Sequence, residues 1–398
     1  MSPIGVSPLR VLWIEQSHPG LGYYDALQHE LSRRGHNVTV WSKHRKSPRL
    51  NHALIGMDVA LVAFGWFHQE SGRIPHISQY LRNQSDTSPA ARNDSLCGRI
   101  PLVVMLNKEY VLMTAKLEWI RIHCVHRALT VHHHAGTFAA NTSTPFTRFT
   151  FGVDIDTFAR GTGASISTAE PDDPNPPHPP QALALPNARG GGAGGVVSTR
   201  ARGMKAALAA AAATAHEYEH DIGFTGVIRG AQTANWRFRI WREAWPRLAA
   251  HKLRLYSGPQ GGVHIGVAHV SLNTSEYVRQ MRASKMWLST TGPADLVGTR
   301  YFEVMATGTT LCVCNRMSDP SVYGSLGIRE GVHVAMFSTL GEFEQLVRNF
   351  SSPDHEQRRM SIVRRAQALA QRKFSWQHVG ATLEKDLAEA ATVGDSGL

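Results

Sequence analysis

The sequence predicts an α/β protein in which buried parallel strands alternate with amphipathic helices. Short apolar, β-prone runs recur along the chain, and most of them precede a segment with helical periodicity. The length of 398 residues is enough for two or three domains, each with its own core. The hydrophobic fraction of 42% and the aromatic fraction of 8% are typical of a globular protein and not of a disordered one.

The chain begins with a strand–loop–helix–strand unit. A strand at 10–15 leads into the loop HPGLG, a helix follows over 23–34, and a second strand spans 37–41. If the two strands are parallel, the connection between them is a right-handed crossover. Gly20 and Gly22 would let backbone amides approach a phosphate or a sugar, and an ordinary tight turn is the alternative interpretation.

The rest of the first half continues in the same pattern. Strands are expected at 57–64, 100–106 and 128–132, with a helix at 112–126. Glu109 follows a strand at its carboxyl end, where it could orient an acceptor or simply pair with Lys108 at a helix start; we favour the pair. His132, His133 and His134 suggest a metal site, but sequence neighbours do not readily converge on one ion, so no metal is expected.

The composition changes between residues 160 and 215. This segment contains PDDPNPPHPP, three consecutive glycines and an alanine tract. No packed core can be built from such a composition, so we interpret the segment as an insertion at a linker and not as a binding module.

The second half resumes the alternation and centres on residues 292–316. Strands are expected at 221–229, 252–256, 285–289, 310–314 and 332–337, and helices at 235–249, 275–283, 340–350 and 361–373. A loop carrying Asp295 and Arg300 feeds a helix that bears Glu303, and a core strand follows. Ligands of open α/β sheets bind where loops leave strand ends. We expect Glu303 in the first helical turn, where the helix dipole favours a carboxylate; a mere capping role is the alternative.

Three segments resemble glycosyltransferases of the GT-B fold and group 1 type. Asp295-x7-Glu303 with the following MATG looks like the E-x7-E segment and E-A-M-A-x-G turn of these enzymes, and TRYFEVMATG is closest to the spore-coat (CgeB-like) group. TRFTFGVDIDTF at 147–158 resembles the signature that closes their N-terminal domain. The region around Trp376 resembles their last helix, which crosses back onto that domain.

The resemblance implies two Rossmann-like α/β domains that face a central cleft. The predicted division is an N-terminal, acceptor-side domain at 1–158, a low-complexity insertion at 159–218, a nucleotide-sugar-binding domain at 219–376, and a C-terminal helix and tail at 377–398.

It also implies an enzyme that transfers a sugar from a nucleotide-sugar donor, without metal or cofactor, to an unknown glycan, lipid, protein or small-molecule acceptor. Glu303 would hold the ribose hydroxyls, and Arg300 and Arg229 would stabilise the leaving diphosphate. The remaining expected donor-binding residues are Asp295, which replaces the family's first Glu, with Thr299, Gly226, Gly20 and Gly22. If the reaction inverts configuration, Glu109 or His18 would be the general base; if it retains configuration, no base is needed.

Charge and cysteine content limit the partners and the compartment. The net charge of +11 suits anionic partners such as nucleotide diphosphates, but the basic residues are scattered and nucleic acid is not expected. The four cysteines, Cys97, Cys124, Cys312 and Cys314, have no metal-ligand spacing and predict reduced thiols. No apolar stretch is long enough to span a membrane, and the start of the chain lacks a signal-peptide core. We therefore expect a cytoplasmic protein, with a Golgi or secretory location as the alternative.

Two other functions are also compatible with the sequence. A catalytically inactive GT-B relic would bind a nucleotide-sugar or a protein, and the replacement of Glu by Asp295 keeps this alternative alive. A nucleic-acid-binding α/β protein would use the positive charge, but it should show a basic, aromatic-lined face that the sequence does not show clearly.

Overall fold

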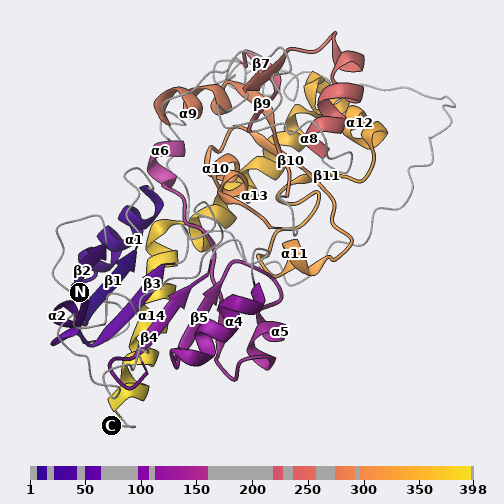
Figure 1. The fold of residues 1–398 in the computed structure, drawn as a ribbon. Coiled ribbons are helices and arrows are strands. Elements are labelled where there is room, and N and C mark those ends of the chain that lie inside the picture. The colour runs from indigo at the N-terminus through magenta and orange to yellow at the C-terminus, as the bar shows by residue number, and fades with distance from the viewer. Residues whose placement is uncertain are drawn as a thin grey trace, which may run out of the picture. The chain divides into compact units, whose positions relative to one another are not determined.

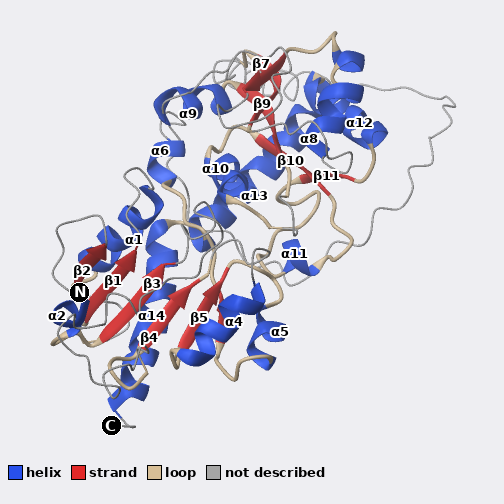
Figure 2. Ribbon diagram, in the orientation of Figure 1, coloured by secondary structure: helices blue, strands red, loops and turns tan. Residues whose placement is uncertain are grey.

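A computed structural model describes residues 7–15, 22–42, 50–63, 97–106, 113–159, 218–226, 236–256, 274–291 and 296–395. Residues 1–160 and 219–398 form one compact unit, to which all the elements below belong. Its helices and strands are labelled in Figure 1 and coloured by type in Figure 2. The predicted insertion lies outside the described residues except at its first and last positions.

The first sheet has six parallel strands in the order β2-β1-β3-β4-β5-β6. Its strands are β1 (Arg10–Glu15), β2 (Asn37–Ser42), β3 (Val59–Ala63), β4 (Leu102–Met105), β5 (Arg127–Thr130) and β6 (Phe146–Arg148). The helices in this half are α1 (Gly22–Arg33), α2 (Leu50–Leu54), α4 (Met113–Ile122), α5 (Ala135–Ala140) and α6 (Ile155–Ala159). The strands predicted from apolar runs are therefore present.

The second sheet has five parallel strands in the order β11-β10-β9-β7-β8. Its strands are β7 (His220–Thr225), β8 (Leu253–Tyr256), β9 (Ser284–Ser289), β10 (Leu311–Asn315) and β11 (Ala335–Phe337). Its helices are α8 (Trp236–Arg239), α9 (Thr274–Arg282), α10 (Thr299–Ala306), α11 (Ser321–Gly324), α12 (Leu340–Ser351), α13 (Glu356–Lys373) and α14 (Trp376–Asp395).

The central strands of the sheets are buried on both faces, which explains why β1, β3, β4 and β10 are almost continuously apolar. In β1, Leu12 and Ile14 join one hydrophobic cluster, while Val11 and Trp13 join another. Successive side chains of a strand point to opposite faces, so a strand covered on both sides must be apolar at every position.

Helix α14 packs on the first sheet although it follows the second in sequence, as the resemblance implies. Its Val379, Leu383 and Leu387 lie in one cluster with Val11 and Trp13. Figure 1 shows the yellow helix running along the strands of that sheet, and α14 contacts α1, β3 and β4.

A buried polar contact fixes the same helix. The fully buried Glu384 carboxylate lies 2.8 Å from Nη1 of Arg34 and 2.9 Å from Nε2 of His36. Nδ1 of His36 accepts the Leu9 N–H at 3.1 Å, so Nε2 of a neutral ring can carry the proton donated to Glu384. Removing one partner of such a buried group costs about 3–5 kcal/mol.

The GVD motif that resembles the end of the N-terminal domain packs against the start of α14. The Val153 N–H donates to the Phe374 carbonyl at 2.7 Å, and Val153 forms a bridge with Ser375. A Cβ added at Gly152 would lie 2.1 Å from the Trp376 ring. Only glycine fits there, and the two segments that connect the sheets therefore lie side by side.

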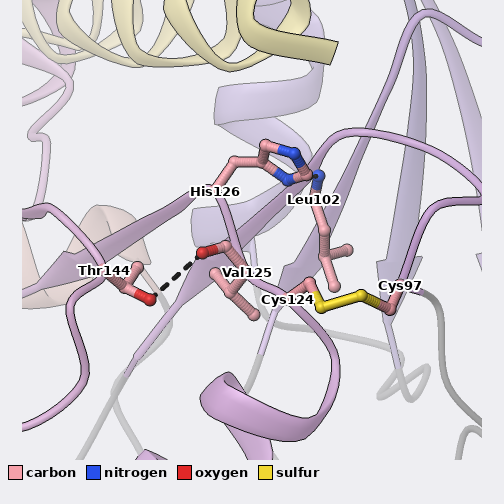
Figure 3. Close-up of a disulfide and its surroundings, with 6 residues drawn as sticks. All are labelled: Cys97, Leu102, Cys124, Val125, His126 and Thr144. Carbon is pink, nitrogen blue, oxygen red and sulfur yellow. Dashed lines mark hydrogen bonds between the residues drawn. A yellow bond between two sulfur atoms is a disulfide. The ribbon is translucent and has the colours of Figure 1, made fainter. Parts of the chain in front are cut away.

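The expectation of four reduced thiols is wrong for two of them. Cys97 and Cys124 form a disulfide with a Cα–Cα distance of 5.0 Å (Figure 3). Two hydrogen bonds lie beside it: the Leu102 N–H donates to Nδ1 of His126, and the Thr144 hydroxyl donates to the Val125 carbonyl. The disulfide joins the turn before β4 to the turn after α4. The spacing of the two cysteines in the sequence does not reveal that these turns are neighbours. A loop of this length contributes roughly 3–4 kcal/mol on the chain-entropy account. Cys312 and Cys314 are free and buried, as expected.

The single helix predicted over 235–249 is also wrong. The segment divides into α8, a π-helical turn at Ile240–Ala244 and a 3-10 turn at Pro246–Leu248. The Trp245 N–H donates to the Ile240 carbonyl at 2.8 Å, five residues back, and Pro246 has no N–H with which to continue a regular ladder.

Among the described residues, no helix is long and apolar enough to cross a membrane. The cytoplasmic location and the domain boundaries stay predictions. A disulfide is most common in oxidising compartments, and this observation supports the secretory alternative.

We predict that Gly223→Ala destabilises the protein. A Cβ at this position of β7 would lie 2.2 Å from the ring of Trp287, which is fully buried. Overpacking of this kind costs about 1–3 kcal/mol, measurable by urea unfolding. The matched control is Gly136→Ala in α5, where a Cβ meets nothing within 4 Å; it should stabilise by about 0.5–1 kcal/mol. Equal stability of the two variants would contradict the packing.

We also predict that His333 makes stability fall at acid pH. Burial, followed by the charge of Arg329, lowers the pKa of His333 from 6.5 to about 4, and its Nδ1 accepts the Arg329 N–H at 3.1 Å. The unfolded chain binds the proton first, so this stabilisation is complete above pH 6.5 and is lost as the pH falls toward 4. Between pH 7 and pH 5 the wild type should lose about 2 kcal/mol more unfolding free energy than His333→Gln. An equal loss in both proteins, measured by urea titration, would refute this role.

Candidate functional site

The candidate site lies at the carboxyl ends of β7 and β9, where the order of the second sheet reverses. From β7 the chain proceeds to β8 on one side and then to β9 on the other side. Open α/β sheets bind their ligands at such a switch point.

Two arginines reach the backbone at the end of β7. A Cβ built on Gly226 would lie 3.2 Å from Nη1 of Arg300 and 3.3 Å from Nη1 of Arg237. Gly226 has φ 139°, a conformation that side chains rarely adopt. Glycine therefore allows both this turn and the close approach of the two guanidinium groups, which come from α8 and α10.

The charge of this arginine pair is partly desolvated. Burial, and then the like charge of Arg300, lowers the pKa of Arg237 to about 10. Nε of Arg237 donates to the Thr290 hydroxyl at 2.7 Å, and its guanidinium lies 5.6 Å from the centre of the Phe224 ring. Within the part of the chain that the structure describes, Arg300 forms no ion pair, so its charge is available to an anion.

Several polar atoms around the arginine pair have unused hydrogen-bonding capacity. Buried Nε of Arg300 and the buried hydroxyls of Thr225 and Ser289 have no hydrogen-bond partner among the described residues. Thr225 ends β7 and Ser289 ends β9. Because buried polar groups are normally paired, such a cluster at strand ends indicates a place where a ligand supplies the partners.

Glu303 lies on the same helix as Arg300 and is held by a tyrosine. The Tyr277 hydroxyl donates to Oε2 of Glu303 at 2.7 Å. Burial, and next the charge of Glu303, raises the pKa of Tyr277, so the phenol stays protonated and remains a donor. The Tyr277 ring meets the rings of Phe158 and Trp287 edge to face. Glu303 is thus oriented from α9, with a half-buried side chain.

The expected position of Glu303 in the first turn of the helix is wrong. Helix α10 begins at Thr299, its first turn contains no acidic residue, and Glu303 is in the second turn. The start is set by Gly298, whose extended backbone forms the N-cap. Glu303 therefore owes its position to Tyr277 and not to the helix dipole.

The structure brings part of the predicted donor site together. Gly226, Arg300 and Glu303 lie around the end of β7 and on α10, and Thr299 is the first residue of that helix. Gly22 is the first residue of α1, after β1 of the other sheet. The remaining predicted site residues fall outside the described residues: His18, Gly20, Glu109, Arg229 and Asp295.

Two residues of the site were not singled out from the sequence. Arg237 belongs to a segment rich in Trp and Arg after β7, and this composition is the signal that could have identified it. Tyr277 carries no motif; only the packing of α9 against β9 and α10 brings it to Glu303.

The side chains of the three adjacent histidines lie close together, although we did not expect this from the sequence. Their possible ligand atoms lie within 4.8 Å of one another, because residues 131–134 turn tightly before α5. Nδ1 of His132, however, accepts the His134 N–H at 3.1 Å, so the neutral ring carries its proton on Nε2. A metal at Nε2 would require the loss of this hydrogen bond. The absence of a metal site stays a prediction.

The comparisons with known proteins agree with this fold. A family model described as glycosyl transferase-like matches residues 226–385, which include Gly226, Arg237, Tyr277, Arg300 and Glu303. A comparison with curated protein sequences finds no match.

Solved structures with the same architecture cover nearly the whole chain. HepE from Anabaena, in complex with UDP and glucose, aligns at TM-score 0.51 and 10% identity over 96% of this chain and 100% of its own. A glycosyltransferase from Rickettsia africae aligns at TM-score 0.51 and 9% identity over 97% and 99% of the two chains. An O-GlcNAc transferase from Thermobaculum terrenum aligns at TM-score 0.51 and 11% identity over 98% and 68%. The predicted α/β fold with two Rossmann-like domains of the GT-B type is therefore confirmed, while the CgeB-like subgroup stays a prediction.

Proposed function

We propose that this protein transfers a glycosyl group from a nucleoside diphosphate sugar to an acceptor. The observation that carries the proposal is the pair of guanidinium groups at Gly226, with Glu303 on the same helix as Arg300. A diphosphate needs positive charge and hydrogen-bond donors, and a ribose needs an acceptor for its hydroxyls. The family model that covers this site supports the same conclusion.

The arginine pair would act on the leaving group. In the transfer, the bond between the anomeric carbon and the diphosphate oxygen breaks, and the diphosphate keeps the electron pair. A new bond forms between the anomeric carbon and an acceptor oxygen, whose proton passes to a base if the reaction inverts configuration and to the departing phosphate if it retains configuration. Arg237 and Arg300 would stabilise the negative charge that develops on the diphosphate, and their positions are fixed before the reaction begins. This charge could replace a metal ion, and metal independence is part of the proposal.

Other groups complete the proposed donor site. Glu303, held by Tyr277, would accept hydrogen bonds from the ribose hydroxyls. The N-terminal end of α10, which begins at Thr299, would add partial positive charge near the phosphates. Arg229, Asp295, Gly20 and Gly22 remain proposed donor contacts, and His18 and Glu109 remain proposed bases for an inverting reaction.

The donor to test first is a UDP-sugar. HepE, which shares the fold, was crystallised with UDP and glucose.

We predict that two substitutions in α10 weaken nucleotide binding in different ways. Arg300→Met should weaken UDP binding but leave uridine binding unchanged, because only the diphosphate meets the guanidinium. Glu303→Gln should weaken both ligands. Hydrogen bonds to charged groups contribute about 1.5–3 kcal/mol, so the expected losses are roughly ten- to hundredfold, measured by calorimetric titration.

The matched control is Arg279→Met on α9, because Arg279 is exposed and paired with Glu276 and Glu219. This variant should bind UDP as the wild type does. If neither UDP nor another nucleoside diphosphate binds the wild type, the donor site is refuted. If UDP binds but no UDP-sugar is hydrolysed or transferred, the inactive alternative is supported.

Tyr277 should behave as a positioning residue. Tyr277→Phe removes the hydroxyl that holds Glu303 but keeps the ring contacts with Phe158 and Trp287. We expect roughly three- to tenfold weaker uridine binding, with no further loss when the change is combined with Glu303→Gln. Additive losses in this double-mutant cycle would show that Tyr277 does not act through Glu303.

A further inference from the structure

Four basic side chains gather where the second half of α13 meets the turn that precedes β11. They are Arg329, Arg365, Arg372 and Lys373, and we call them the basic patch. After burial, the charges of these four residues are the causes that lower the pKa of His333. All four charges therefore lie within electrostatic range of one imidazole ring, although they come from two separate segments of the chain.

The fold of these two segments explains how the patch is assembled. Arg365 and Arg372 are two helical turns apart and share one side of α13, while Ile362 and other buried residues of the same helix face the core. At the end of the helix, Nζ of Lys373 lies 3.0 Å from the position that a Cβ on Gly327 would take. The end of α13 is thus packed against the segment that leads to Arg329 and His333.

The basic patch has no counter-charge of its own. None of its four side chains forms an ion pair with any residue that the structure describes. The neighbouring Glu330 does not supply one, because its carboxylate is paired with Arg316. Three of the four patch residues are exposed. Such a surface, on a chain with a net charge of +11, attracts a partner that carries many negative charges.

The surroundings of the patch favour one class of polyanion. Helix α13 packs against α10 and β10, so it is not free to enter the major groove of a nucleic-acid duplex. Single strands are held by stacking on exposed aromatic rings, but the patch contains no aromatic residue and the adjacent Phe374 is only 1% exposed. A bilayer with anionic lipids presents a plane of charged headgroups, which a shallow patch can contact without insertion.

We propose that the basic patch docks this protein on an anionic membrane surface. The contact is electrostatic, because the large apolar side chains that are exposed among the described residues lie on or next to α2, α4 and α14 and not in the patch: Ile55, Ile122 and Val393. Each basic residue held near an anionic leaflet strengthens binding roughly fivefold. The inference does not depend on the proposed donor site, since no patch residue belongs to that site.

The test is co-sedimentation of the full chain with vesicles of phosphatidylcholine alone and of phosphatidylcholine mixed with phosphatidylglycerol. The patch variant combines Arg372→Gln with Lys373→Gln and removes two exposed charges. The matched control combines Arg121→Gln with Lys385→Gln, which lowers the net charge equally but at exposed residues outside the patch. Far-ultraviolet circular dichroism should show that both double variants keep the wild-type fold.

We expect the wild type to bind the mixed vesicles and not those of phosphatidylcholine alone. Raising the salt from about 0.1 M to about 1 M should release it, because the Debye length becomes shorter. The patch variant should bind roughly 25-fold more weakly, and the control variant should bind as the wild type does.

Three results would overturn the proposal. The first is that the wild type does not bind the mixed vesicles, or stays bound at about 1 M salt. The second is an equal loss of binding in the two double variants, which would show that net charge and not the patch is responsible. The third is tighter binding to DNA, as a duplex or a single strand, than to the mixed vesicles at the same phosphate concentration, which would make nucleic acid the partner.

Discussion

Two like charges held close together at the end of a parallel strand are the constraint on which the second sheet is built. Arg237 and Arg300 come from helices on different connections, and both reach Gly226. Burial and the like charge of Arg300 lower the pKa of Arg237, and a bound anion would offset this repulsion. The strand order that reverses between β7 and β9, the glycine at positive φ and the hydroxyls at the strand ends all lie at this end of the sheet.

The support of the site extends well beyond the residues that would touch a donor. Phe158, the last residue of the segment 147–158 that contains the GVD motif, packs on Tyr277, and Tyr277 orients Glu303. Earlier in the same motif, Gly152 fits under Trp376 at the start of α14. One short segment therefore connects the first sheet, the carboxylate of the proposed donor site and the helix that returns to the first sheet. Its sequence is restricted by packing at both ends.

The sequence predicts the central strands well because strands such as β1, β3, β4 and β10 are buried on both faces and must be largely apolar. The expected strand at 10–15 coincides with β1, and those at 252–256 and 285–289 agree with β8 and β9 to within one residue. Glu303 and Arg300 could be identified because a motif marks them. Arg237 and Tyr277 could not, since they reach the site through tertiary packing. The Cys97–Cys124 disulfide and the convergence of the three histidines were missed for the same reason: both depend on how turns meet in space.

The most direct test of the donor site is a crystal structure of the protein with bound UDP. The account predicts phosphate oxygens within hydrogen-bond distance of the Arg237 and Arg300 guanidinium groups, beside the Gly226 backbone, and ribose hydroxyls on the Glu303 carboxylate. A nucleotide bound elsewhere, or bound here with its diphosphate turned away from both arginines, would contradict the account.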